Sequence, residues 1–483
     1  MKIVQNDGAF LELFSASFEE LETIRQNFSY RDLSNQYKYT AAKNNKFMWK
    51  KQPYEWAKYV NDLKASIYQN LLIEKNGNFF VYSGLKEKLF DVLKFYSIKF
   101  EYTNNLYYPG FSPIPYLLHY TPYCLHPYQE TAIEMLLSNP HSSIELPTGS
   151  GKQFVIQNLI KKSGLSTLIV VPFKSIAYQF INGMKEAFGE KYIGLYGDNK
   201  KEFKKKIVIG IADSISSLKE SSEAYKFLNK KECIIIDESH LVGAPTVASI
   251  STGIAKNIPY RWSVSATQLR IDGKNLLLEG IIGKIIYKQT FRELVECGFL
   301  SDLHFIIYNV LSSSNFVSEN PSNMMRNHHL YNNSIIQIAA KIANIKYSEN
   351  ESTLILIDEI KQEEILKNYL TVPYEFAQSD SNVSEKIENF NNKKTLVLIG
   401  TKAITTGANT RPTDNIILLI SGKSIIKYKQ ALGRGTRIYP GKKKCTVFDF
   451  NICNINLCKK HFENRLSLYK ELSSHIKFHD LIK

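Results

Sequence analysis

Short apolar runs recur along the chain, and stretches with helical spacing separate them. In a first series these runs cover residues 143–146, 167–171, 207–211, 233–236 and 261–265. Strands that are buried on both faces appear as continuous apolar runs, whereas strands with one solvated face alternate apolar and polar residues. The regular alternation of such runs with helical segments predicts an α/β fold whose parallel sheet has helices on both faces.

A second series of the same kind covers residues 353–357, 395–399, 415–420 and 445–450. Between the two series, residues 311–326 are rich in Ser and Asn, which is typical of a loop. The chain is therefore predicted to contain two similar α/β domains in tandem.

The first hundred residues follow a different pattern. The short apolar run 79–82 precedes a helical stretch at 85–96, which predicts a small α+β module. Residues 102–124 contain four prolines among aromatic residues, so we expect an extended connector there. We expect this module either to stabilise the rest of the chain by packing or to bind duplex DNA. The predicted boundaries are an α+β domain at 1–105, a connector at 106–124, a first α/β domain at 125–310, a linker at 311–330 and a second α/β domain at 331–483.

The charge of the chain is strongly basic and unevenly distributed. The formal net charge is +15 and the pI is about 9.2. From residue 421 to 483 there are 14 Lys or Arg against 4 Asp or Glu. An excess of this kind is most simply used to bind a polyanion such as nucleic acid, although it also suits a surface that is merely kept soluble by charge.

The six cysteines are scattered along the chain, and no export signal or run of 18 apolar residues is visible. We therefore expect reduced thiols in a cytoplasmic protein with no membrane partner. Cys453, Cys458 and His461 suggest a zinc site, but their spacing matches no standard zinc motif.

A glycine-rich segment follows the first apolar run of the first series. It comprises Pro147, Thr148, Gly149, Ser150, Gly151 and Lys152. Glycines allow backbone N–H groups to point inward at phosphate oxygens, and a lysine supplies positive charge to the β and γ phosphates. The segment therefore predicts a phosphate-binding loop for ATP. The next residue in such loops is Ser or Thr, whose hydroxyl binds Mg²⁺, but this chain has Gln153, whose amide oxygen is a weaker ligand. We still expect ATP hydrolysis, with reduced turnover, and the alternative is an inactive site.

Two carboxylates come at the end of a later apolar run, 233–236. Asp237 is expected to hold Mg²⁺, directly or through water, and Glu238 to orient or deprotonate the attacking water. The pairing of these carboxylates with the phosphate-binding loop predicts an ATP-hydrolysing motor.

Transfer of a phosphoryl group also requires positive charge, which arginines often supply from another domain. Gln430, Arg434 and Arg437 lie in a glycine-containing segment of the second series. Two arginines three residues apart are predicted to share one helical face and to reach into a cleft between the domains. The alternative is a generic basic surface together with Lys442 and its two neighbours.

The order of these motifs resembles that of the superfamily 2 helicases, which implies two RecA-like motor domains that use ATP and Mg²⁺. The resemblance assigns adenine recognition to Gln129 in the segment 125–129. It further assigns strand contacts to Pro172, Phe173, Lys174, Thr401 and Lys402, coupling to Ser265, Ala266, Thr267 and His240, nucleotide contacts to Gly407 and Asn409, and motif VI to residues 430–437. Phe173 and Tyr428 either stack on bases or belong to the packed interior.

Segments 237–241, 249–253, 269–275, 282–287 and 294–298 are most similar to the UvsW-type recombination and fork-remodelling helicases of phages. This narrower resemblance implies a monomer in the host cytoplasm that acts on branched DNA such as forks, Holliday junctions and displacement loops. Two alternatives stay open: the motor of a restriction or defence complex, and an ATP-gated DNA-binding protein whose Gln153 has disabled turnover.

Overall fold

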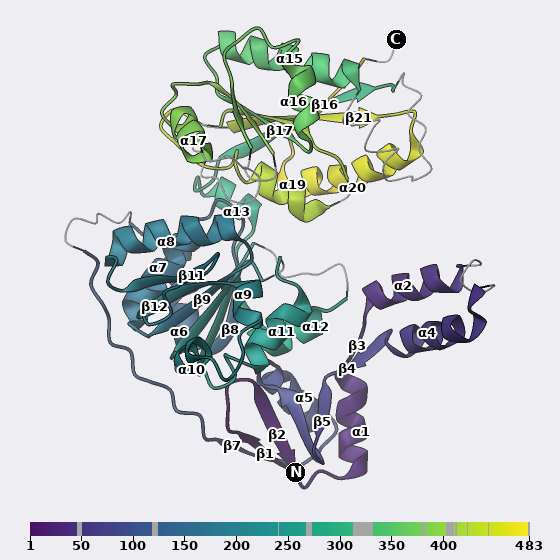
Figure 1. The fold of residues 1–483 in the computed structure, drawn as a ribbon, viewed down its shortest axis with the longest axis vertical. Coiled ribbons are helices and arrows are strands. Elements are labelled where there is room, and N and C mark those ends of the chain that lie inside the picture. Colours follow the sequence, from purple (N-terminus) through teal and green to yellow (C-terminus); the bar gives the residue numbers. More distant parts are fainter. Residues whose placement is uncertain are drawn as a thin grey trace. The chain divides into compact units, whose positions relative to one another are not determined.

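The computed structural model describes residues 1–45, 51–117, 124–239, 241–266, 273–312, 332–378, 382–401, 410, 413–422, 424–442 and 444–481. They form two compact units, one of residues 1–146 and 152–288 and the other of residues 147–151 and 289–483. Figure 1 traces the chain through three large sheets, which have five, eight and seven strands. No helix in the described ranges is long and apolar enough to cross a membrane.

The first large sheet belongs to the N-terminal α+β module. Its order is β5-β6-β2-β1-β7, and β1 runs parallel to β7 but antiparallel to β2. The strands are β1 (Lys2–Gln5), β2 (Phe10–Phe14), β5 (Leu72–Lys75), β6 (Asn78–Tyr82) and β7 (Glu101–Asn104). Helices α1 (Phe18–Asn27) and α5 (Lys86–Phe95) bury Leu21, Ile24, Leu89 and Leu93 in the same core as the sheet. The strand predicted at 79–82 and the helix predicted at 85–96 are both confirmed.

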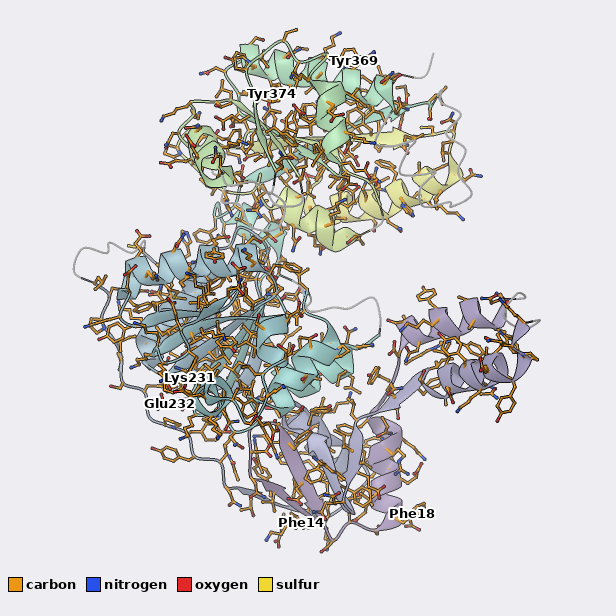
Figure 2. The ribbon with its side chains drawn as sticks, viewed as in Figure 1. Phe14, Phe18, Lys231, Glu232, Tyr369 and Tyr374 are labelled. Carbon is orange, nitrogen blue, oxygen red and sulfur yellow. The ribbon has the colours of Figure 1, made fainter. Side chains whose placement is uncertain are left out.

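A helical arm is inserted into this module. It consists of β3 (Ser29–Arg31), α2 (Leu33–Lys43), α4 (Pro53–Ala65) and β4 (Tyr68–Asn70), and the two short strands pair antiparallel at its base. The indole nitrogen of Trp56 in α4 donates a hydrogen bond to the Ala42 carbonyl of α2 at 2.8 Å. Figure 2 shows the side chains that the two helices of the arm carry.

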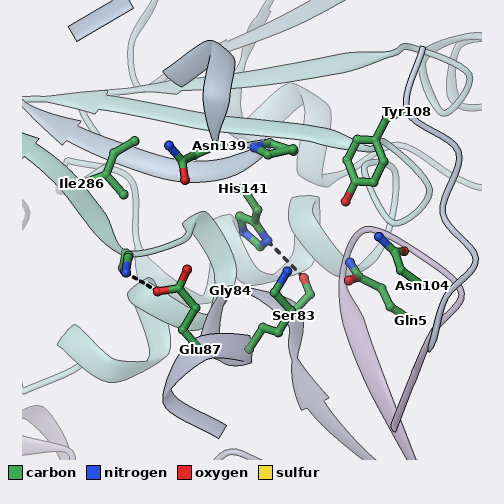
Figure 3. A pocket seen from close by; sticks show the side chains of 12 residues that line it. Gln5, Ser83, Gly84, Glu87, Asn104, Tyr108, Asn139, His141 and Ile286 are labelled. Carbon is green, nitrogen blue, oxygen red and sulfur yellow. Dashed lines mark hydrogen bonds and ion pairs between the residues drawn. The ribbon is translucent and has the colours of Figure 1, made fainter. Parts of the chain in front are cut away.

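The N-terminal module packs on the eight-stranded sheet through a short 3-10 helix, η1 (Ser83–Leu85). A Cβ on Gly84 would lie 2.4 Å from the Glu279 carbonyl oxygen, so this close approach requires glycine. A polar pocket of about 190 Å³ lies beside the contact, where Ser83 and His141 share a 3.2 Å hydrogen bond (Figure 3). Burial lowers the pKa of His141 to about 3, so its imidazole is neutral. The pocket therefore lies where the N-terminal module packs against the rest of the first unit.

The eight-stranded sheet has the order β11-β10-β12-β9-β13-β14-β8-β15, and all of its neighbours are parallel except β10 and β11. Its strands are β8 (His141–Glu145), β9 (Thr167–Val171), β10 (Ile193–Gly197), β11 (Lys200–Lys201), β12 (Ile207–Ile211), β13 (Cys233–Asp237), β14 (Tyr260–Ser265) and β15 (Ile285–Lys288). Its helices are α6 (Pro127–Ser138), α7 (Lys152–Ser163), α8 (Lys174–Phe188), α9 (Ala212–Ser216), α10 (Glu223–Leu228), α11 (Ala244–Thr252) and α12 (Asn275–Ile282). The five strands predicted in the first series are confirmed, and no boundary differs by more than two residues.

The seven-stranded sheet is wholly parallel and has the order β18-β19-β17-β20-β21-β16-β22. Its strands are β16 (Asp302–Val310), β17 (Thr353–Ile357), β18 (Glu375–Ala377), β19 (Val397–Gly400), β20 (Asn415–Leu419), β21 (Lys444–Ile452) and β22 (Ile476–Asp480). Its helices are α13 (Phe291–Glu296), α15 (Asn333–Ser348), α16 (Ile360–Leu366), α17 (Val383–Asn391), α19 (Ile425–Leu432) and α20 (Asn456–Leu472).

Both faces of this sheet are buried, as predicted. Leu354 and Leu356 belong to one apolar cluster with residues of α19 and α20, whereas Ile355 and Ile357 belong to another with residues of α15 and α16. Neighbouring residues of one strand point to opposite faces, so the continuous apolar run of β17 is explained by helices on both sides.

One predicted boundary is wrong. Residues 302–310 were assigned to the first α/β domain, but they form β16, which pairs along its whole length with β21 of the second sheet. This strand does not appear in the sequence as a continuous apolar run. Along most of its length, half-buried side chains alternate with buried ones. The predicted linker at 311–330 lies almost entirely outside the described residues.

A buried polar network ties α20 to β21 in the second unit. The guanidinium of Arg465 donates to a carboxylate oxygen of Asp449 at 2.8 Å, and the Tyr469 hydroxyl donates to the same oxygen at 2.8 Å. Asp449 is 0% and Arg465 is 3% exposed, so each depends on the other for its charge to be tolerated inside the protein.

We expect Arg465→Leu to lower the free energy of unfolding of the second unit by about 3–5 kcal/mol, because it leaves the Asp449 carboxylate buried without its counter-charge. Hydrogen exchange of the β21 amides measures this loss locally. Lys460→Ala on the exposed side of the same helix is the matched control and should leave exchange unchanged. Equal protection in the two variants would contradict the prediction.

Candidate nucleotide-hydrolysis site

The phosphate-binding loop connects β8 to the first residue of α7. Gly149 and Gly151 have φ angles of +92° and +79°, a backbone region that side chains with a Cβ rarely adopt. The loop therefore needs both glycines for its shape. It ends at the N-terminus of α7, where free backbone N–H groups and the helix dipole favour phosphate.

The predicted carboxylates stand where β13 ends. Glu238 has a φ of +47°, and its backbone N–H donates to the Val264 carbonyl at 3.1 Å. One carboxylate oxygen of Glu238 accepts the backbone N–H of Ala266 at 3.1 Å, and the other lies 2.8 Å from Nζ of Lys152. The structure thus brings Lys152, Glu238 and Ala266 together, and it links the segment after β14 directly to the carboxylate expected to orient water.

Asp237 is almost fully buried, with 4% of its surface exposed. Burial raises the pKa of its carboxyl well above the usual range. The nearby negative charge of Glu238 raises this pKa further, whereas the positive charge of Lys152 lowers it. Its Oδ1 atom is buried with no hydrogen-bond partner among the described residues. A buried acceptor left open in this way fits a hard cation such as Mg²⁺, which prefers oxygen ligands.

Gln153 lies in the first turn of α7, and its side chain contacts α8. Its side-chain nitrogen donates to the Gln179 carbonyl of α8 at 3.4 Å. A Cβ on Gly183 would lie 2.5 Å from the same nitrogen, so any larger residue at 183 would displace the amide from this position. The amide nitrogen of Gln153 therefore bonds to the neighbouring helix, and a role of its oxygen as a weak metal ligand stays a prediction.

Gln129, the expected adenine contact, is 4% exposed in the first turn of α6. Its side-chain oxygen accepts the backbone N–H of His126 at 3.0 Å, and its nitrogen donates to the Tyr128 hydroxyl at 3.4 Å. The amide thus caps its own helix in this structure.

The segment after β9 places two of its three expected strand contacts, Phe173 and Lys174, at the surface. Pro172 is buried, whereas Phe173 is 42% exposed. Nζ of Lys174 lies 2.7 Å from a carboxylate oxygen of Asp198, which also accepts the Tyr178 hydroxyl at 2.8 Å. These two partners lower the pKa of Asp198. Sequence reasoning did not identify Asp198, and its only local signal is the Asp-Asn pair at the turn after β10.

The arginine segment departs from its predicted geometry. Helix α19 ends at Leu432, so Arg434 lies in the following turn and Arg437 lies beyond it. Arg434 is 7% exposed, and burial together with the charge of Arg437 lowers its pKa to about 9. Arg437 donates to the Thr410 carbonyl at 3.1 Å. The prediction of two arginines on one helical face is therefore wrong, because the helix stops before either of them. Gln430 lies in the last turn of α19 and is half-buried.

Tyr428 is fully buried and belongs to the interior of the second unit. Its hydroxyl donates to the Ile420 carbonyl at 2.9 Å, and the Arg465 guanidinium lies 5.2 Å from its ring centre. The packing interpretation is confirmed and base stacking by this residue is ruled out.

Several predicted positions lie outside the described residues, namely His240, Thr267, Lys402, Gly407 and Asn409. Thr401 is described, and its backbone N–H donates to the Ala377 carbonyl at 3.4 Å. Cys453, Cys458 and His461 do not come together as metal ligands. Within the described ranges, the group of side chains close enough to share an ion is Asp302, His304 and His475.

Comparison with protein families identifies two matching segments. The sequence model described as "Type III restriction enzyme, res subunit" matches residues 123–270. The model described as "Helicase conserved C-terminal domain" matches residues 334–439. The first segment contains the phosphate-binding loop and both carboxylates, and the second contains the arginine segment.

Curated relatives carry helicase names. "Putative helicase 22" of Sulfolobus islandicus filamentous virus is 27% identical over 340 residues, which cover 63% of this chain and 59% of the relative. "DNA 3'-5' translocase XPB2" of Sulfurisphaera tokodaii is 29% identical over 218 residues, which cover 44% of this chain and 46% of the relative. The chain thus spans roughly half the length of these relatives.

Among solved structures, a fragment of an HsdR subunit of a type I restriction enzyme from Vibrio vulnificus has the same fold. It aligns with a TM-score of 0.53 at 17% identity and covers 76% of this chain and 69% of its own. The structure of T4 UvsW covers 99% of both chains at 15% identity, with a TM-score of 0.44.

The raised pKa of Asp237 predicts a pH-dependent requirement for Mg²⁺. Below that pKa a proton occupies the carboxyl, and it must leave before the cation binds. We therefore expect the apparent Mg²⁺ affinity, measured by fluorescence titration with a non-hydrolysable ATP analogue, to rise by up to about tenfold per pH unit until the carboxyl is ionised. Asp237→Asn should lose this dependence; a variant that kept it would place the titrating group elsewhere.

Proposed function

Because the chain belongs to the superfamily 2 helicases, we propose that it hydrolyses ATP with Mg²⁺ to move along or unwind branched DNA. The observation that carries the proposal is the cluster of Lys152, Glu238 and Ala266 beside the open, buried oxygen of Asp237. These are the groups that phosphoryl transfer from ATP to water needs, held at the end of one sheet.

The contacts of the cluster support a separate role for each residue. Lys152 and Glu238 neutralise each other at 2.8 Å, and the γ-phosphate of ATP competes with Glu238 for the lysine. Release from the ion pair leaves the Glu238 carboxylate able to accept a proton from water, while Ala266 and Ser265 keep it in place. Asp237 would hold Mg²⁺, which neutralises charge on the phosphates. Family resemblance alone assigns charge stabilisation to Arg434 and Arg437.

Three features support DNA as the partner. The relative from Sulfurisphaera is named a DNA translocase, and the basic excess after residue 421 suits a polyanion. Phe173 is exposed beside Lys174 after β9, at the place where the family resemblance expects a bound strand. The preference for branched DNA follows from the segments that resemble UvsW-type helicases.

A second candidate function is the motor of a restriction or defence complex. It is favoured by the match of residues 123–270 to the restriction-enzyme res subunit. Copurification of a nuclease subunit with the tagged chain from its native host would support this second function. The first candidate function requires no nuclease partner.

The first test is phosphate release from Mg-ATP with fork DNA, four-way junction DNA and single-stranded RNA. We expect strong stimulation by the branched DNAs and a loss of about 100-fold in Lys152→Ala, because the charge that stabilises the transferred phosphoryl group is removed. Lys161→Ala, at the far end of the same helix, is the matched control. Stimulation by RNA alone would overturn the choice of DNA.

A further prediction concerns Gln153. Because its amide bonds to α8 and Mg²⁺ can be held by Asp237, phosphate oxygens and water, we expect the unaltered protein to hydrolyse ATP. Gln153→Thr should then lower the Mg²⁺ concentration needed for half-maximal rate by several-fold, since a hydroxyl joins the ligands. No phosphate release from the unaltered protein, with release restored by Gln153→Thr, would instead show an ATP-gated DNA-binding protein.

A further inference from the structure

The helical arm exposes large aromatic side chains that its own folding does not use. Helix α2 has no buried residue, and α4 buries only Val60 and Leu63. Tyr37 is 73% and Tyr54 is 82% exposed, and Tyr59 and Tyr68 are also more than half exposed. Single exposed aromatics are common, but a group of them on one small element marks an interaction surface.

The arm is also basic. From residue 33 to 65 the sequence has seven lysines and only Glu55 and Asp62 as acids. Lys38, Lys43, Lys58 and Lys64 are all exposed, and none of these four forms an ion pair within the described part of the chain. Tyr54 and Lys58 are four residues apart and share one face of α4, so an aromatic ring and a positive charge stand side by side.

The base of the arm is fixed by other residues. The buried carboxylate of Asp32 accepts the backbone N–H groups of Ser34 and Asn35, and it lies 3.0 Å from Nζ of Lys274 in the first unit. A Cβ on Gly273 would lie 2.2 Å from the Arg31 carbonyl oxygen, so the arm meets the segment before α12 closely. The exposed tyrosines and lysines therefore do not contribute to the contacts that hold the base of the arm.

We propose that the helical arm binds single-stranded nucleic acid, with unpaired bases stacked on Tyr37 and Tyr54 and phosphates held by Lys38 and Lys58. Stacking platforms combined with positive charge are the means by which proteins hold single strands without reading sequence. An acidic membrane surface is less suitable, because membrane-binding helices carry a continuous face of Leu, Phe and Trp rather than dispersed tyrosines. The proposal rests on the proposed function, since the arm would bind the single strand that the motor separates from its partner strand.

The test is fluorescence anisotropy without nucleotide, with a labelled single-stranded oligonucleotide and a blunt duplex of the same length. We expect Tyr37→Ser with Tyr54→Ser to weaken single-strand binding about 10- to 100-fold, because two stacking contacts are lost, and to leave duplex binding nearly unchanged. Tyr107→Ser is the matched control, because Tyr107 is 79% exposed outside the arm. Lys38→Gln with Lys58→Gln should weaken binding and reduce its salt dependence.

Circular dichroism of each variant shows that the helices are retained, and DNA-independent ATP hydrolysis should stay at the level of the unaltered protein. Unchanged single-strand binding in the tyrosine variant would overturn the proposal, as would an equal loss for duplex and single strand. Binding to phosphatidylserine vesicles that these substitutions abolish, with DNA binding intact, would assign the arm to membranes instead. Because the assay contains no ATP, its outcome is independent of whether Lys152→Ala abolishes hydrolysis.

Discussion

Burial of both faces of the parallel sheets is the constraint on which the rest of the structure depends. Strands such as β9, β13 and β17 contain almost only apolar side chains because helices cover them on each side. Polar chemistry is thereby excluded from the sheet faces and concentrates where the strands end. In the eight-stranded sheet, β13 lies between β9 and β14, and β8 follows β14. The loops after these four strands are therefore neighbours, and they carry the phosphate-binding loop, Asp237 and Glu238, Ser265 and Ala266, and the segment from Pro172.

That concentration has an electrostatic consequence. A carboxylate as buried as Asp237 is costly when ionised, and the adjacent Glu238 adds repulsion. Lys152 offsets part of this cost through its ion pair with Glu238. The site consequently places two carboxyl groups beside one lysine. A bound cation and phosphate would complete this set of charges, which suits nucleotide binding rather than a purely structural role.

The helical arm obeys the opposite rule. Its helices bury little, so their sequence is not constrained by packing, and aromatic and basic residues occupy positions that a core helix would give to Leu or Ile. The two kinds of structure thus differ in what they provide: buried strands position the residues of the proposed nucleotide site, and an exposed helix pair carries the surface proposed to bind nucleic acid.

The sequence by itself determined nine central strands of the two α/β sheets, the position of the glycine-rich loop and the carboxylates that accompany it, because apolar periodicity and glycine conformations are local properties. Strand positions such as Thr167–Val171 and Thr353–Ile357 followed directly. Only the tertiary structure decided the non-local matters. It paired β16 with β21, turned the Gln153 amide onto α8, gave Lys174 its partner Asp198, ended α19 before Arg434 and buried Tyr428. Each of these depends on which residues distant in the chain become neighbours, and no short-range pattern encodes that.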